Sequence, residues 1–95
     1  MAVEVSSGKP YHDFNLMTDQ KLRLFREDVK EEQLIWHRDL SNREVRVEDG
    51  VGWKLQMDNE LPVDLVIGEK YNIPKMVYHR IIKGQGNLVL RIQEI

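Results

Sequence analysis

Hydrophobic residues recur at every second position through most of the chain, which is the period of a β-strand with one buried face. The alternation covers residues 45–47, 53–57, 63–67 and 88–92, and the intervening residues are polar or charged except for Val66 and Val89. Turn-forming segments separate these runs: EDGVG, MDNELP and KGQG, the last of which reads as a hairpin turn. Short strands between such turns predict an all-β, mainly antiparallel sandwich or barrel.

The segment 18–32 has two readings. Leu22, Phe25 and Val29 have helical spacing, whereas Leu22 and Leu24 alternate with charged residues as in a half-buried strand. A strand is expected, because every later run has the β period.

The chain of 95 residues has the size of one domain. Residues 1–13 contain few large apolar side chains and include SSGKP. They are expected to form an N-terminal arm, with edge pairing at Val3 or Val5. The rest, residues 14–95, is expected to form a single barrel.

Composition excludes several classes of function. The formal net charge of -2 gives no basic field, so no nucleic-acid partner is expected. Because the chain has no cysteine, it has no disulfides, thiolate metal sites or thiol catalysis. No apolar run approaches the roughly 18 residues of a membrane span, and the start does not resemble a secretory leader, so a cytoplasmic protein away from membranes is expected.

Two groups of residues stand at characteristic intervals: His37, Asp39, Arg43 and Gly50, and then Gly68, Pro74, Met76 and His79. These intervals resemble the two motifs of the cupins, and the stretch from His37 to about Glu94 resembles a small single-domain member of that family. The resemblance implies a cupin-like jelly-roll barrel (a double-stranded β-helix). The chemistry departs from the family pattern, because Asp39 replaces the second histidine, Arg43 a glutamate and Met76 a glycine. The standard four-ligand metal site is therefore not expected.

Side-chain alternation decides between Arg43 and Glu44 as the pocket residue. Val45 and Val47 must face the core, and residues two apart share a face. Arg43 therefore points inward, while Glu44 belongs to a charged outer row. The predicted pocket, formed by a strand, a turn and a returning strand, contains His37, Asp39, Arg43 and His79.

Two histidines and one aspartate form the facial triad that holds non-haem iron. His37, Asp39 and His79 are therefore candidate ligands of one divalent metal, iron, manganese or zinc. The pattern also resembles the ligand set of 2-oxoglutarate-dependent oxygenases. Arg43 either clamps a carboxylate of a substrate or pairs with Asp39, in which case no metal is expected. His37 also has a structural reading, as a core histidine satisfied by Asp39 or a carbonyl.

Three functions stay open. The preferred one is a pocket protein that binds a small polar or anionic molecule through His37, Asp39, Arg43 and His79. The first alternative is a mononuclear metalloenzyme of the cupin type, and the second is a structural or interaction protein with a vestigial pocket. Whether the protein is an enzyme stays undecided, and the pattern names no substrate. Exposed edge strands and the resemblance to small cupins imply a homodimer.

Overall fold

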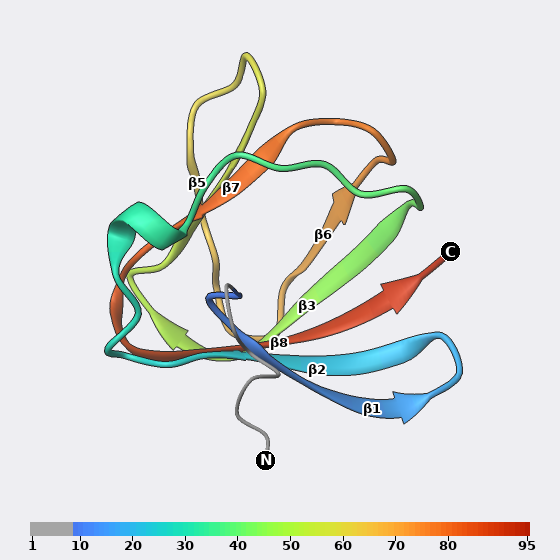
Figure 1. Ribbon diagram of the computed structural model, residues 1–95, viewed down its shortest axis with the longest axis horizontal. Coiled ribbons are helices and arrows are strands. Elements are labelled where there is room, and N and C mark those ends of the chain that lie inside the picture. The colour runs from blue at the N-terminus through green and yellow to red at the C-terminus, as the bar shows by residue number, and fades with distance from the viewer. Residues whose placement is uncertain (1–8) are drawn as a thin grey trace.

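The computed structural model describes residues 9–95, so the expected pairing at Val3 or Val5 lies outside the described residues. Within these residues, eight strands form two sheets that face each other (Figure 1). The five-stranded sheet has the order β1-β2-β8-β3-β6 and the three-stranded sheet the order β5-β4-β7. The strands are β1 (His12–Met17), β2 (Gln20–Phe25), β3 (Arg43–Val51), β4 (Lys54–Met57), β5 (Val63–Asp64), β6 (Lys70–Ile73), β7 (His79–Ile82) and β8 (Gln85–Glu94). Every pairing is antiparallel, which confirms the predicted all-β class.

The chain passes between the two sheets four times, and two of these crossings form corners that lie against each other. β3 leads into β4 at one corner and β7 leads into β8 at the other, so KGQG is a sheet-to-sheet corner and not the predicted hairpin turn. The corners touch at Gly84, where an added Cβ would lie 2.4 Å from backbone atoms of Gly52, Trp53 and Val51. Only glycine permits this approach. The predicted EDGVG turn is instead the end of β3, which bends through register shifts between Val47 and Val51.

Segment 18–32 contains a strand, β2, as expected, followed by a short 3₁₀-helix at Glu31–Gln33. The face of β2 is the reverse of the predicted one, since Arg23 and Phe25 are buried and Leu24 is only half-buried. Phe25 packs against Trp53 in the core, with ring centroids 6.0 Å apart. Arg23 is held by Asp13 of β1. Because β1 begins at His12, the expected boundary between the arm and the barrel, at residues 13 and 14, falls within this strand.

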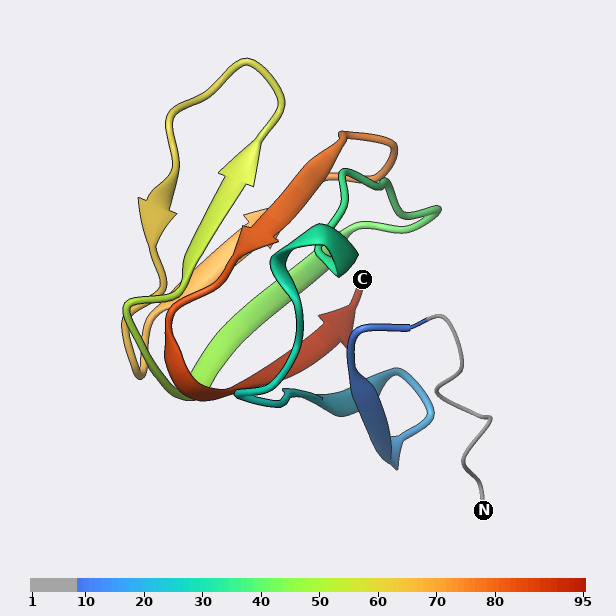
Figure 2. The same cartoon turned by 60° about the vertical axis from the view of Figure 1, so that its left-hand side comes forward.

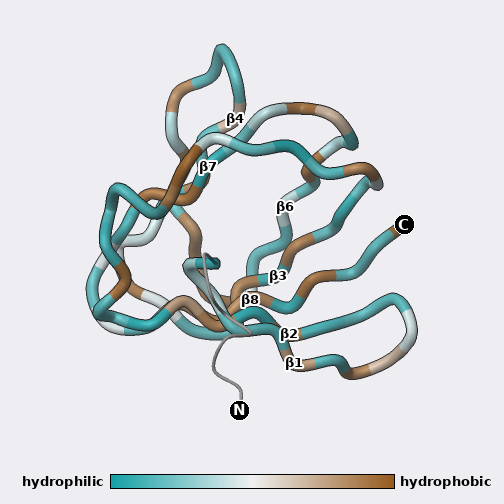
Figure 3. The backbone as a smooth tube through the Cα atoms, viewed as in Figure 1, coloured by the Kyte–Doolittle hydropathy of each residue, from teal (hydrophilic) through white to brown (hydrophobic). Residues whose placement is uncertain are grey.

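The core lies between the two sheets. It is made of large apolar side chains from most of the strands, namely Phe25, Val29, Val45, Val47, Trp53, Leu55, Leu65, Ile73, Ile81, Leu88, Leu90 and Ile92. Hydrophobic and hydrophilic stretches follow one another along β3 and β8 in Figure 3, and buried positions alternate with more exposed ones over much of both strands. Burial of this alternating set supplies the main driving force for folding.

The segment that carries His37 and Asp39, before β3, is not the first strand of the predicted strand–turn–strand pocket. It makes one isolated bridge between His37 and His79, with backbone N–O distances of 3.0 and 2.8 Å. Beyond the bridge, the Met76 N–H donates to the Asp39 carbonyl, and the Lys75 N–H donates to the Asn42 side chain (both 2.8 Å). These single hydrogen bonds replace a ladder, and the segment runs irregularly beside β7 (Figure 2). Within residues 9–95, no helix has the length and apolar character needed to cross a membrane.

Candidate functional site

The four residues predicted for the pocket line one cavity of about 270 Å³. His37 and Asp39 come from the irregular segment, Arg43 begins β3 and His79 begins β7. His79 is 3% exposed, whereas the other three are partly buried. The cavity therefore lies between the two sheets, with its polar residues gathered where the irregular segment crosses β7.

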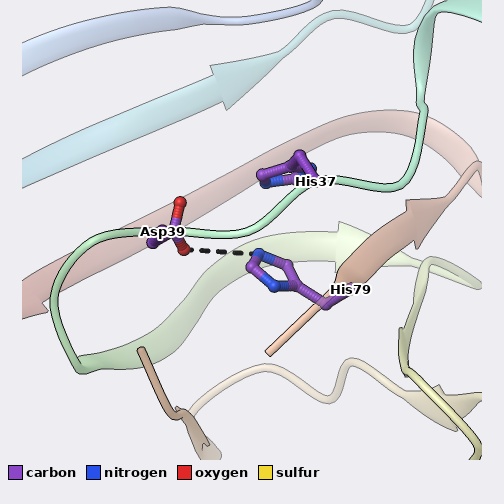
Figure 4. A group of neighbouring side chains, drawn as sticks. All are labelled: His37, Asp39 and His79. Carbon is purple, nitrogen blue, oxygen red and sulfur yellow. Dashed lines mark ion pairs between the residues drawn. The ribbon is translucent and has the colours of Figure 1, made fainter. Parts of the chain in front are cut away.

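The backbone bridge brings the two imidazoles together. Their ring centroids are 4.3 Å apart, at an interplanar angle of 60°. Asp39 follows His37 by two residues and turns its carboxylate towards His79 (Figure 4). Candidate ligand atoms of His37, Asp39 and His79 all lie within 4.8 Å of one another.

Hydrogen bonds to backbone carbonyls orient both rings. His37 Nδ1 lies 3.2 Å from the Ile35 carbonyl oxygen, and His79 Nδ1 lies 2.9 Å from that of Val77. A carbonyl only accepts, so in each ring Nδ1 carries the proton and donates it. This leaves Nε2 of each neutral ring with a free lone pair, the arrangement seen in metal-binding histidines.

The carboxylate of Asp39 is only half satisfied. Its Oδ1 lies 3.3 Å from Arg43 Nη1, and its Oδ2 lies 3.4 Å from His79 Nε2. Oδ2 is buried and has no hydrogen-bond partner, and among the described residues the only other such side-chain atom is Arg43 Nε. Buried polar atoms without a partner are rare and point to a missing ion or water.

The protonation of His79 explains why Asp39 Oδ2 is unsatisfied. Burial lowers the pKa of His79 below its usual value, and with the nearby His37 and Arg43 it outweighs the opposite effects of the Val77 carbonyl and the Asp39 charge. At neutral pH, Nε2 then carries no proton, so two lone pairs face each other across 3.4 Å. A cation between them would remove this repulsion.

The donor set fits a divalent metal. Two imidazole nitrogens and one carboxylate oxygen form the set typical of non-haem iron, and zinc and manganese also accept such ligands. Metal–ligand bonds of about 2.0–2.2 Å place ligand atoms about 3.0–3.6 Å apart. The His79–Asp39 distance already falls in this range, and ligand atoms as far apart as 4.8 Å would have to approach by roughly 1.2–1.8 Å. His37 and Asp39 lie on an irregular segment that single hydrogen bonds, and no ladder, hold beside β7.

Arg43 lies inside the pocket and Glu44 outside it. Besides Asp39, the Arg43 guanidinium binds Glu94 Oε2 through Nη2, at 3.3 Å. Glu44 pairs with Lys70 at 3.8 Å on the outer face. The Asp39–Arg43 pair that the sequence left as one alternative is thus present, but it occupies only Oδ1 and leaves Oδ2 to face His79.

Sequence reasoning missed Glu94. It shares a face of β8 with Leu88, Leu90 and Ile92, so alternation alone would have directed it into the barrel.

Sequence reasoning also missed a second ion pair, which involves an arginine of the cavity wall. Arg23 lies in this wall and forms a two-point ion pair with Asp13 (2.8 and 2.9 Å), and its guanidinium stacks 3.7 Å from the Tyr11 ring. The only signal in the sequence was Phe25, because a buried phenylalanine two residues along the strand directs Arg23 to the same inner face of β2.

Solved structures share this fold. A cupin-2 domain protein from Shewanella frigidimarina is 20% identical, with a TM-score of 0.65 over 90% of this chain and 79% of that one. A cupin domain from Bordetella pertussis is 16% identical, with a TM-score of 0.61 over 90% of this chain and 91% of that one. These similarities confirm the predicted cupin-like barrel.

An Fe(II) form of HppE is also similar, with 14% identity and a TM-score of 0.68 over 90% of this chain and 48% of HppE. At these identities, the similarity to solved structures concerns the fold. No protein-family model matches the chain, and the comparison with curated proteins finds no match.

Proposed function

We propose that this cupin-fold chain binds a small molecule at one divalent metal ion held by His37, Asp39 and His79. One observation carries the proposal: Asp39 Oδ2, buried and without a hydrogen bond, faces His79 Nε2 at 3.4 Å. HppE, a structural neighbour solved with Fe(II) and with Co(II), supports a metal in such a barrel.

Each residue has a definite task at this site. The Ile35 and Val77 carbonyls hold the two imidazoles with Nε2 available, and Arg43 holds Asp39 through Oδ1 so that Oδ2 faces His79. Glu94 fixes the other side of the Arg43 guanidinium. When bound, a divalent metal supplies Lewis-acid polarisation of a ligand oxygen, and iron adds redox chemistry.

Elemental analysis tests the proposal. Protein purified without chelator should carry close to one metal ion per chain, and apo protein should take up Zn²⁺, Mn²⁺ or Fe²⁺ in a calorimetric titration. His79→Ala should lose this uptake. His12→Ala is the matched control, because His12 is exposed on β1 and lies outside the cluster. Wild-type protein that takes up none of these ions, or uptake that survives His79→Ala, would contradict the proposal.

The second candidate is a metal-free pocket for a small anion. The ion pair between Asp39 and Arg43, at 3.3 Å, favours it, because the guanidinium already neutralises part of the carboxylate charge. In that case, a small carboxylate should raise the melting temperature of chelator-treated protein while metal salts have no effect.

We also propose that the protein is a homodimer, as the sequence led us to expect. β1 is an edge strand of the larger sheet, and its Phe14 and Leu16 are 52% and 42% exposed. An edge strand with exposed apolar side chains favours pairing with a second copy. Light scattering should give about twice the chain mass of 11.3 kDa, and a mass of one chain would exclude the dimer. The cytoplasmic location stays a prediction.

A further inference from the structure

The cavity is chemically divided into a polar end and an apolar wall. The polar end holds the His37–Asp39–His79 cluster and Arg43. The wall includes Phe25, Ile73, Ile81, Leu90 and Ile92, which come from β2, β6, β7 and β8. A ligand that fills this space needs a polar head at the cluster and an apolar body against the wall, because a buried polar group without a partner costs free energy.

Charge at the polar end determines which head group fits. Asp39 and Glu94 carry two negative charges against the one positive charge of Arg43, so this end sums to minus one without metal. A divalent cation changes the sum to plus one. An anionic head is therefore repelled by the empty site and attracted by the loaded one.

The end of the cavity away from the His37–Asp39–His79 cluster does not favour the binding of a second anionic group. Arg23 is the buried cation there, and Asp13 neutralises it through two hydrogen bonds of 2.8 and 2.9 Å. Tyr11 covers its guanidinium at 3.7 Å. Lys9 is exposed to solvent, which screens its charge.

We propose that the ligand of this pocket is a small monocarboxylate with an apolar body, bound with its carboxylate at the metal-loaded end. This inference rests on the proposed metal site. The cavity volume of about 270 Å³ is just below the roughly 300–1,000 Å³ of typical small-molecule pockets, so an aromatic or branched aliphatic acid suits it. Metal and carboxylate should each strengthen the binding of the other, because their coupling free energy is reciprocal.

Calorimetry on zinc-loaded protein with four probes tests this inference. Benzoate should bind about tenfold or more tightly than benzamide, which has the same shape without the charge. It should exceed acetate by a similar factor, because acetate has the head without the apolar body. Terephthalate, with a second carboxylate at the far end, should bind about tenfold or more weakly than benzoate. Removing zinc with a chelator should abolish benzoate binding.

The outcomes separate this inference from the proposed metal site. If zinc does not bind, the metal site fails. If zinc binds but benzamide or terephthalate equals benzoate, the metal site stands and the monocarboxylate is wrong. If benzoate binds the chelator-treated protein as tightly as the zinc-loaded one, the coupling between metal and ligand is wrong.

Discussion

Two arginines in the wall of the same cavity, Arg23 and Arg43, each pair with an aspartate, and the two pairs differ in how completely they are satisfied. Arg23 and Asp13 meet through two hydrogen bonds of 2.8 and 2.9 Å, so both carboxylate oxygens have a partner. Arg43 and Asp39 meet at 3.3 Å through one oxygen, and the pair leaves Asp39 Oδ2 and Arg43 Nε buried without partners. We call Arg23–Asp13 the closed pair, because both carboxylate oxygens are used. We call Arg43–Asp39 the open pair, because it has unused bonding capacity.

This difference separates a structural pair from a functional one. The closed pair neutralises a cation that β2 carries into the barrel, so removing one partner should damage the fold. The open pair and its histidines keep lone pairs that a bound cation would satisfy, so the free-energy cost of burying these groups should fall when a cation binds. Four measurements test this difference between the two pairs.

The largest effect is expected from Asp13→Asn. The substitution leaves the Arg23 guanidinium, 7% exposed, without its counter-charge. Because Asp13 is itself partly exposed, we expect a loss of roughly 2–4 kcal/mol in the free energy of unfolding, slightly below the cost of breaking a fully buried pair. Urea unfolding measures it.

Asp28→Asn is the matched control for this loss. Asp28 pairs with Arg26 at 3.5 Å on the surface, where both side chains are more than half exposed, so its loss should stay below about 0.5 kcal/mol. Equal losses in the two variants would contradict the structural role of the closed pair.

Metal bound at the open pair should stabilise the folded protein. At a concentration about 100 times its dissociation constant, a divalent ion that binds only the native state adds about 2.7 kcal/mol to the free energy of unfolding. For a domain of this size, such a gain raises the melting temperature by more than about 10 °C. Calorimetric melting of wild-type protein should show it.

Two variants locate the origin of this gain. Asp13→Asn should keep it, although its baseline is lower, whereas His79→Ala should lose it. Stabilisation that persists in His79→Ala would place the ion elsewhere.

Acid should remove part of what the closed pair contributes. Burial raises the pKa of Asp13, but the hydrogen bonds and charge of Arg23, together with Lys21, outweigh it and hold the pKa below its ordinary value. The unfolded chain then binds more protons than the native one, so stability is complete above the unfolded pKa of about 3.9 and falls as pH drops through the lower native pKa. The stability difference between wild type and Asp13→Asn should therefore shrink from pH 7 to pH 3. An unchanged difference would show that Asp13 titrates normally.

The smallest effect is expected from Asp39→Asn in chelator-treated protein. Arg43 keeps Glu94, and the new amide can donate to His79 Nε2, the contact that the carboxylate could not satisfy. We expect a change within about 1 kcal/mol of wild type, of either sign. The same variant should bind metal much more weakly, as a titration would show. A loss as large as that of Asp13→Asn would make Asp39 a second structural residue.

Sequence alone predicted the strand-rich barrel, because the period of two sets which side chains share a face. That parity directed Arg43 into the cavity and Glu44 away from it, and the motif intervals selected His37 and His79 as neighbours. These conclusions depend on local spacing, which a chain carries whatever its distant partners are.

Only the tertiary structure decided how the polar groups meet. The inward turn of Arg23 depends on Asp13 across the β1–β2 pair, and the second partner of Arg43 comes from Glu94, which is 51 residues away. The Asp13 oxygens lie 2.8 and 2.9 Å from Arg23 nitrogens that donate to them. Asp39 Oδ2 lies 3.4 Å from His79 Nε2 and receives no hydrogen bond. Pairings between distant segments depend on sheet register and loop course, which hydrophobic alternation does not encode.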